Sequence, residues 1–436
     1  MPLPPARPTP ALHHACWLPS LTPCLPGRCG ADPIPLVPPP RPAGLRELCI
    51  NTLPADLARL TQITLLQACL SDAFLKAPLP DLAPIAALPA LRHLTLTHAT
   101  SRAFEPGYWV DRYTPAQHAQ LQAAVGALTA LTALELRMVM DVGALPPLPE
   151  LRSLATSGGL QVGALRQVPQ LTRLEARRLL GWQAAAGTPP QCPLLQHATL
   201  WCLDGLAAVA PQLQHLTCLD QAEGDTRQLA QLSELRSLQL PEYFAVGFSP
   251  DLGALLGSRC TRVVLTHFDA DVASLPLCRG ARELDLSFCM GADKCQRGAC
   301  AIPADMSYSP IYADDAADAA DRAASWLGAM QGSGVVDLTL RYGNSDWFDV
   351  RWLQPLAAWG SLQRLVLDGG DNFSSSMTMR GLDRFAAACR QAGSPLRHIE
   401  LCMRLTDHWV QERLTMCAAV EAAHPGITCT APLPGL

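Results

Sequence analysis

Leucine recurs along most of the chain in strings of the form Leu-x-x-Leu-x-Leu, such as LRHLTL at 91–96 and LRSLQL at 235–240. Successive side chains of a strand point to opposite faces, so the string 151–156 predicts that Leu154 faces the core while Ser153 and Ala155 face outward. Each string therefore predicts one short strand.

A second apolar pattern precedes many strings, with a period near three, as at Leu229, Leu232 and Leu235. That spacing favours a helical turn packed against the strand layer. We count fourteen strings, whose first positions are Leu45, Leu60, Leu91, Leu131, Leu151, Leu171, Leu195, Leu213, Leu235, Cys260, Ala281, Val335, Leu362 and Leu396. The repetition predicts a solenoid of strand-plus-helix units, in which each unit buries its apolar face on the next.

The strings between about 45 and 405 resemble those of leucine-rich repeat proteins. The resemblance implies an α/β solenoid with a curved ladder of parallel strands, helical or irregular convex returns, and a concave face that binds another protein. That family usually places Asn or Cys three positions after the last core residue of the string, where only Cys289 fits here. The other positions read Ala99, Val139, Gly159, Leu179, Gln221, Tyr243 and Gly370. Without an asparagine ladder, the loops after the strands must satisfy their backbone groups differently.

The predicted organisation is a tail at 1–44 followed by one repeat domain at 45–436, with insertions at 97–130 and 287–334. The tail holds 14 of the 39 prolines, which predicts an extended, disordered segment. Its stretch PLVPPPRP at 35–42 also suits a ligand for an SH3-like or WW-like domain.

The composition limits the class of partner and the cellular compartment that we expect. Hydrophobic residues make up 49% of the chain, enough for a continuous core, and the net charge is −5 without a basic block, which argues against nucleic acid as a partner. The seventeen cysteines are scattered, and we see neither a secretory signal nor an apolar run able to span a bilayer. We therefore expect a cytoplasmic protein.

The first insertion predicts a helix over 116–128, started by Thr114 and Pro115. Its aromatic residues Tyr108 and Trp109 are candidate partner contacts, or they pack over the neighbouring repeat.

The second insertion carries Cys289, Cys295 and Cys300, which lack the fourth ligand and the short knuckle of a structural zinc site. Its aspartates from Asp314 to Asp321 do not follow a calcium-loop pattern and suit a helix amino end.

No phosphate loop, nucleophile elbow, zinc-protease or dinucleotide motif occurs in the sequence, so we expect no enzyme activity and no cofactor. Outward positions of the strings carry mixed charges, which suit a protein partner. His197 and His215 fall in the same slot of adjacent strings and are predicted to lie side by side, where a metal or pH-sensing role is the alternative to surface polarity. The candidate partner-binding residues are Arg137, Arg173, Arg177, His197, Trp201, His215, Tyr108 and Trp109.

The leading hypothesis is a non-catalytic scaffold that binds a protein partner on the concave strand face. Three alternatives stay open. The string LPADL at 53–57 resembles the opening of an F-box, which would make the protein a substrate receptor of a ubiquitin ligase. Divergent repeat proteins similar to this one also occur on the ciliary axoneme and cytoskeleton. In the third alternative, the insertion at 287–334 is a metal-responsive or enzymatic element.

Overall fold

The computed structural model describes residues 46–50, 53, 56–70, 81–98, 114–137, 141–182, 192–288, 312–342, 353–368, 379–402 and 407–431. The chain forms two compact units, one of 1–140 with 145–155 and the other of 141–144 with 156–436. The predicted tail at 1–44 lies outside the described residues.

The first unit is built on five strands that neighbour one another in sequence order. They are β1 (Glu47–Ile50), β2 (Leu65–Leu70), β3 (His93–His98), β4 (Ala133–Arg137) and β5 (Ser153–Thr156). The pairs from β1 to β4 are parallel. The connecting helices are η1 (Leu57–Arg59), α1 (Ala83–Ala86) and α2 (Pro115–Gly126).

The second unit continues the same construction with ten parallel strands, again in sequence order. They are β7 (Arg173–Ala176), β9 (His197–Cys202), β10 (His215–Glu223), β11 (Ser237–Pro241), β12 (Arg262–Phe268), β13 (Glu283–Phe288), β14 (Asp337–Tyr342), β15 (Arg364–Asp368), β16 (His398–Cys402) and β17 (Thr428–Thr430). A separate parallel pair joins β6 (Gly159–Gln161) to β8 (Arg178–Leu180).

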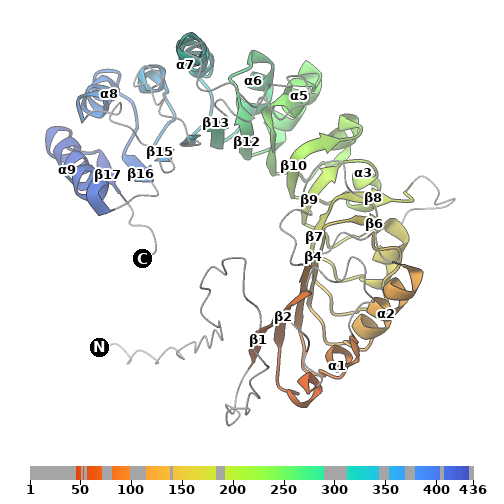
Figure 1. Cartoon of the computed structure of the whole chain (residues 1–436). Helices are drawn as coiled ribbons and strands as arrows, with labels where there is room; N and C mark the ends of the chain where they lie inside the picture. The colour runs from red at the N-terminus through yellow and green to blue at the C-terminus, as the bar shows by residue number, and fades with distance from the viewer. Residues whose placement is uncertain are drawn as a thin grey trace, which may run out of the picture. The chain divides into compact units, whose positions relative to one another are not determined.

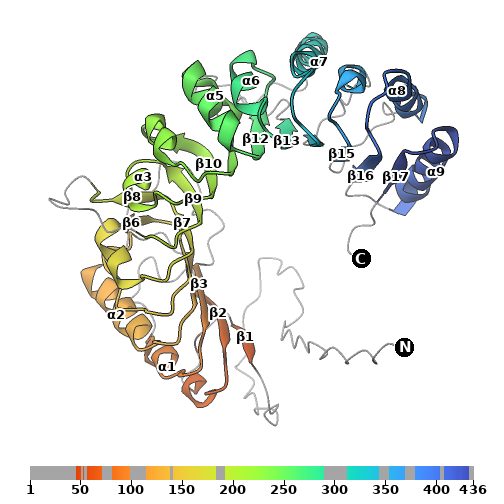
Figure 2. The same ribbon diagram turned by 180° about the vertical axis from the view of Figure 1, so that it is seen from behind.

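Helices in the second unit lie on one side of the strand layer, as Figure 1 shows for α5 to α9 and Figure 2 shows from behind. They are η4 (Val162–Gln167), α3 (Leu206–Val209), η5 (Thr226–Gln231), α4 (Glu242–Val246), α5 (Pro250–Arg259), η6 (Val272–Ser274), α6 (Leu275–Cys278), α7 (Tyr312–Ala329), η9 (Gln354–Ala358), α8 (Met379–Gln391) and α9 (Asp407–Ala423). We call the helix side convex and the other side the strand face. Parallel strands with a helical return after most of them make this an α/β leucine-rich repeat solenoid, as the strings predicted.

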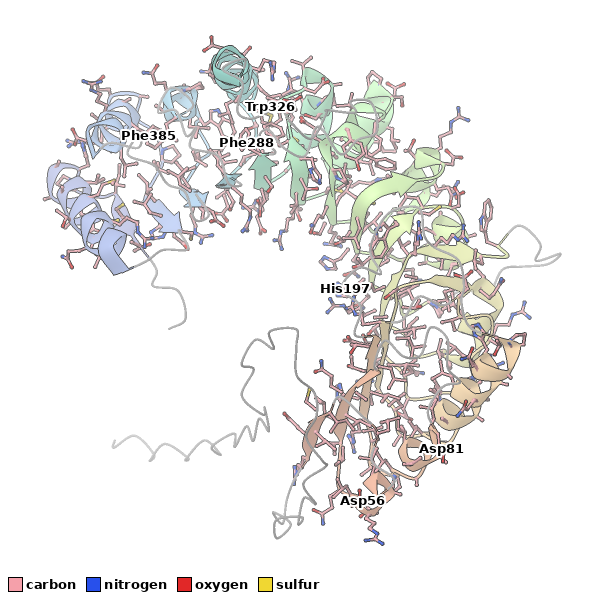
Figure 3. The ribbon with its side chains drawn as sticks, viewed as in Figure 1. Asp56, Asp81, His197, Phe288, Trp326 and Phe385 are labelled. Carbon is pink, nitrogen blue, oxygen red and sulfur yellow. The ribbon has the colours of Figure 1, made fainter. Side chains whose placement is uncertain are left out.

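The core lies between the strands and the helices. The central leucines of the strings are buried, and Leu154, Leu174 and Leu238 have no exposed surface. Figure 3 shows Trp326 between α7 and the strand layer. Its indole nitrogen donates to the Asp271 carbonyl at 3.0 Å and to Ser274 Oγ at 3.1 Å. Trp326 thus joins α7 to the turn after β12, and Ala323 and Leu327 of the same helix are also buried.

Two details of the predicted ladder are wrong. In the second string the register is shifted by three residues, because β2 pairs Leu66 with Leu94, which makes Ile63 the buried first position in place of Leu60. The last strand, β17, was missed, since Cys429 occupies the central position where the other strings usually have Leu. At both places, pairing with the neighbouring strand determines the register, whereas the number of leucines in the string does not.

The first predicted helix start is confirmed. Thr114 caps α2 with a full capping box, in which its hydroxyl accepts from Gln117 N and its own amide donates to Gln117 Oε1 at 2.7 Å. This reciprocal pair satisfies amides that the first turn cannot bond internally.

Carboxylates in the loops after the strands accept hydrogen bonds from loop amides, as asparagine side chains usually do in the family pattern. Asp141 Oδ1 accepts from Gly159 N at 2.6 Å, and Asp204 Oδ1 accepts from Asp225 N at 3.0 Å. Glu242 accepts from the amides of Asp269 and Asp271 in the next loop. Asp141 and Asp204 lie two and one positions after the slot that the family pattern uses, and Glu242 lies one position before it, so a different side chain of the same region satisfies these loops.

Candidate functional site

Three of the candidate partner-binding residues form one row across adjacent strands of the second unit. The register pairs Arg173 on β7 with His197 on β9, and His197 with His215 on β10. Their side chains stand on the strand face because the alternate positions, such as Leu174 and Leu216, are buried beneath them. Figure 3 shows His197 on the side of the strands that faces away from the helices.

The two imidazoles of this row are stacked. Their ring centroids lie 4.3 Å apart with an interplanar angle of 5°, as the shared slot predicted. Partial burial lowers the pKa of His197, and the nearby positive charges of His215 and Arg173 lower it further. The pair therefore favours a neutral His197 until an anion arrives to offset the positive charge.

Arg173 is an exposed cation at the end of this row. Within the described part of the chain, no ion pair or hydrogen bond engages its side chain, whereas Arg341 and Arg364 on the same face are held by acids. An exposed guanidinium of this kind is available to bind a carboxylate in a bidentate way.

Arg177 and Trp201 meet at the carboxyl ends of β7 and β9. The amide of Trp201 donates to the Arg177 carbonyl at 3.1 Å, and the amide of Cys202 donates to the same oxygen at 3.0 Å. Both side chains are half-buried. Arg177 and Trp201 each follow a member of the histidine row by four positions, Arg177 after Arg173 and Trp201 after His197, so five of the eight candidates come from three adjacent strands and the residue after β7.

The other three candidates do not join this group. Arg137 belongs to β4 in the first unit, where its Nε lies 3.5 Å from Glu135 Oε2. Tyr108 and Trp109 lie outside the described residues.

A network of charges on β13 to β16 was not predicted as a unit. Arg341 Nε lies 3.0 Å from both oxygens of Asp285, and its Nη1 lies 3.0 Å from Asp368 Oδ2. Farther along, Arg364 pairs with Glu400. These residues alternate with the buried positions of their strands, but the partners are 27 to 56 residues apart in sequence. Comparing matching slots of consecutive strings is the signal that would have found them.

The described residues contain no group of three or more His, Cys, Asp or Glu side chains arranged to hold a metal ion. The predicted metal candidates Cys289, Cys295 and Cys300 lie outside the part that the structure describes. In that same part, no helix combines the length and the apolar character needed to cross a bilayer.

The chain is similar to some solved structures at low identity. No family model matches the sequence, and no curated protein matches it. Among solved structures, the leucine-rich repeat-containing protein LegL7 from Legionella pneumophila shares 12% identity with a TM-score of 0.36, over 62% of this chain and 82% of LegL7. An internalin, InlF, from Listeria monocytogenes shares 13% identity with a TM-score of 0.29, over 87% of this chain and 76% of the internalin.

Proposed function

We propose that the protein is a non-catalytic interaction scaffold, and that the strand face of its second unit binds an acidic segment of a protein partner. The observation that carries this proposal is the row of Arg173, His197 and His215, where a cation without a described partner stands beside two stacked imidazoles. We call these three residues the basic row.

The basic row has the chemistry of an anion-binding surface. An acidic side chain placed over it gains a bidentate contact with the guanidinium and favours protonation of His197, which the nearby positive charges otherwise oppose. Half-buried Trp201, four positions after His197 on β9, offers apolar contact area of the kind that is enriched at protein interfaces.

The basic row differs from the arginines elsewhere on the strand face in having no acidic partner among the described residues. The arginines of β14 and β15 are neutralised by Asp285, Asp368 and Glu400, so an acidic partner would have to displace those acids first. At the basic row nothing described has to be displaced. The acidic segment is therefore expected to approach β7 to β10.

Panning random displayed peptides against the full-length protein tests this function. We expect the selected peptides to be rich in Asp and Glu, to bind more weakly as salt rises, and to bind Arg173→Glu at least tenfold more weakly. The matched control is Arg227→Glu, because Arg227 is exposed on η5 on the convex side and carries the same charge change.

Two further readouts locate the contact. A photo-crosslinking residue in place of Thr199, on the strand face, is expected to capture the selected peptide, whereas one in place of Gln231, exposed on η5, is not. Binding is also expected to raise the pKa of His197, measured by NMR. Selected peptides that lack acids, that bind Arg173→Glu unchanged, or that crosslink only from η5 would contradict the proposal.

A further inference from the structure

We propose that Cys417 and Cys429 form a reversible dithiol–disulfide modification site that ties the last strand of the array to its last helix. Cys417 lies on α9 and Cys429 on β17, and their sulfur atoms are 3.0 Å apart. This inference is independent of the proposed binding function.

The two thiols are held against each other by their surroundings. Both are buried, with 4% and 5% of their surfaces exposed. The amide of Cys429 donates to Glu421 Oε1 at 2.8 Å, and Glu421 lies one helical turn after Cys417 on α9. Because this bond fixes β17 to the same face of α9, the sulfur atoms need only a small movement to reach bonding distance.

The environment assigns different roles to the two sulfur atoms. The thiol of Cys429 donates to Cys417 Sγ, which lowers the pKa of Cys417 against the effect of burial, and Arg413 lowers it further. The same hydrogen bond, with burial, raises the pKa of Cys429. Cys417 is therefore the nucleophile and Cys429 the resolving thiol.

Arg413 is a buried cation one turn before Cys417 on α9. Its Nη1 donates to the Leu401 carbonyl at 3.4 Å, while its Nε has no hydrogen-bond partner among the described residues. A buried guanidinium with unused donor capacity stabilises a neighbouring thiolate.

Cys389 and Cys218 lack these features. Burial raises the pKa of Cys389 and of Cys218 to about 12. Neither has a hydrogen bond to a second sulfur among the described residues. Buried thiols with raised pKa values react slowly, so the pair stands apart from them.

The chemistry requires a two-electron oxidant, which we take to be a hydroperoxide. The Cys417 thiolate attacks one peroxide oxygen, so an S–O bond forms, the O–O bond breaks and, with hydrogen peroxide, water leaves after protonation. Cys429 sulfur then attacks the sulfenic acid, losing its proton as the S–S bond forms and the S–O bond breaks, and a second water leaves. Two thiols are oxidised to one disulfide and one peroxide is reduced to two waters.

Access to the pair comes from the edge position of β17 in the described sheet. Strand β17 is hydrogen-bonded to β16 on one side, and no described strand covers its other edge. Terminal elements open more readily than central ones, which admits a small oxidant, and the disulfide then restrains that opening.

The test is peroxide titration of the full-length protein, followed by alkylation and peptide mass spectrometry. We expect a linked 417–429 peptide, lost on treatment with dithiothreitol, to form at least tenfold faster than Cys389 is oxidised. In Cys429→Ser, a sulfenic acid at Cys417 should be trapped by dimedone, while in Cys417→Ser, Cys429 should stay a thiol. The control Cys389→Ser should form the link at the wild-type rate.

Hydrogen exchange of β17 gives a second measurement that needs no variant. Oxidation of the wild-type protein is expected to slow exchange of the β17 amides while leaving β7 to β12 unchanged. The proposal is overturned if both cysteines remain singly alkylated while Cys389 oxidises, if Cys429 reacts equally fast in Cys417→Ser, or if the linked peptide forms without any change at β17.

Discussion

The carboxylate of Asp285 on β13 accepts hydrogen bonds from Nε and Nη2 of Arg341 on β14, each at 3.0 Å. Asp285 is buried, whereas about half of the Arg341 side chain is exposed. These interactions raise the pKa of Arg341, the hydrogen bond to Asp285 being the largest cause. The pair fixes β14 against β13 on the strand face, and among the described residues Arg341 is the one cation that pairs with Asp285.

Removing that cation is expected to destabilise the second unit. Arg341→Ala leaves the buried Asp285 carboxylate without its charged partner, which should lower the free energy of unfolding by about 1 to 3 kcal/mol. The double variant Arg341→Ala with Asp285→Ala should recover part of this loss, because no buried charge then remains unpaired. Urea unfolding followed by circular dichroism measures both.

A neighbouring ion pair provides the matched control. Arg262 and Glu283 are 3.8 Å apart on the same face, and more than half of each side chain is exposed. Arg262→Ala is therefore expected to change the free energy of unfolding by less than about 1 kcal/mol. Equal losses for Arg262→Ala and Arg341→Ala would show that burial of Asp285 is not what matters.

Glu242 makes the stability of the second unit depend on pH. Burial raises its pKa to about 7, although the amides of Asp269 and Asp271 and the Ser274 hydroxyl donate to it and oppose the rise. Between the unfolded value of 4.5 and about 7, the folded chain holds a proton that the unfolded chain releases, so stability falls as pH rises through this window.

The difference between the wild type and Glu242→Gln isolates this effect. The wild type should lose up to about 3 kcal/mol more than the variant as pH rises from about 4.5 to 7. Urea midpoints measured across the range check this, and parallel curves for the two proteins would contradict the raised pKa.

Gly280 allows α6 and the turn after it to approach α5. A Cβ at Gly280 would overlap the Gly257 carbonyl, lying 2.6 Å from its carbon, where only backbone could yield. We expect Gly280→Ala to lower the free energy of unfolding by about 1 to 3 kcal/mol through overpacking. In Gly328→Ala, the new methyl meets nothing within 4 Å, so this helix substitution should be neutral or stabilise by up to about 1 kcal/mol. Thermal unfolding of both variants compares them directly.

The architecture could be predicted from the sequence because one side-chain period defines it. Leu154 was expected to face the core, and it has no exposed surface, like the leucines Leu174, Leu238 and Leu365 at the same position of other strings. The prediction was wrong where a string departs from leucine, as at Ile63, or lacks it, as at Cys429. At those places pairing with the adjacent strand decides the register, and a single string carries no information about its neighbour.

The candidate site could be predicted only in part, for the same reason. The stack of His197 on His215 followed from a shared slot in adjacent strings, so local sequence was enough. The bond from Asp285 to Arg341 spans 56 residues, and the thiol contact of Cys417 with Cys429 depends on how α9 packs on β17. Such contacts are set by tertiary packing.

The loop carboxylates also influence how the repeat array unfolds. Glu242 connects the loop after β11 to the loop after β12, and most contacts in such an array are between neighbours. Under denaturant or mechanical load, such a repeat array unfolds in a single step only while every contact between neighbouring repeats stays intact. Weakening the Glu242 junction would create a boundary in the middle of the second unit, and the strands on either side would then unfold in separate steps.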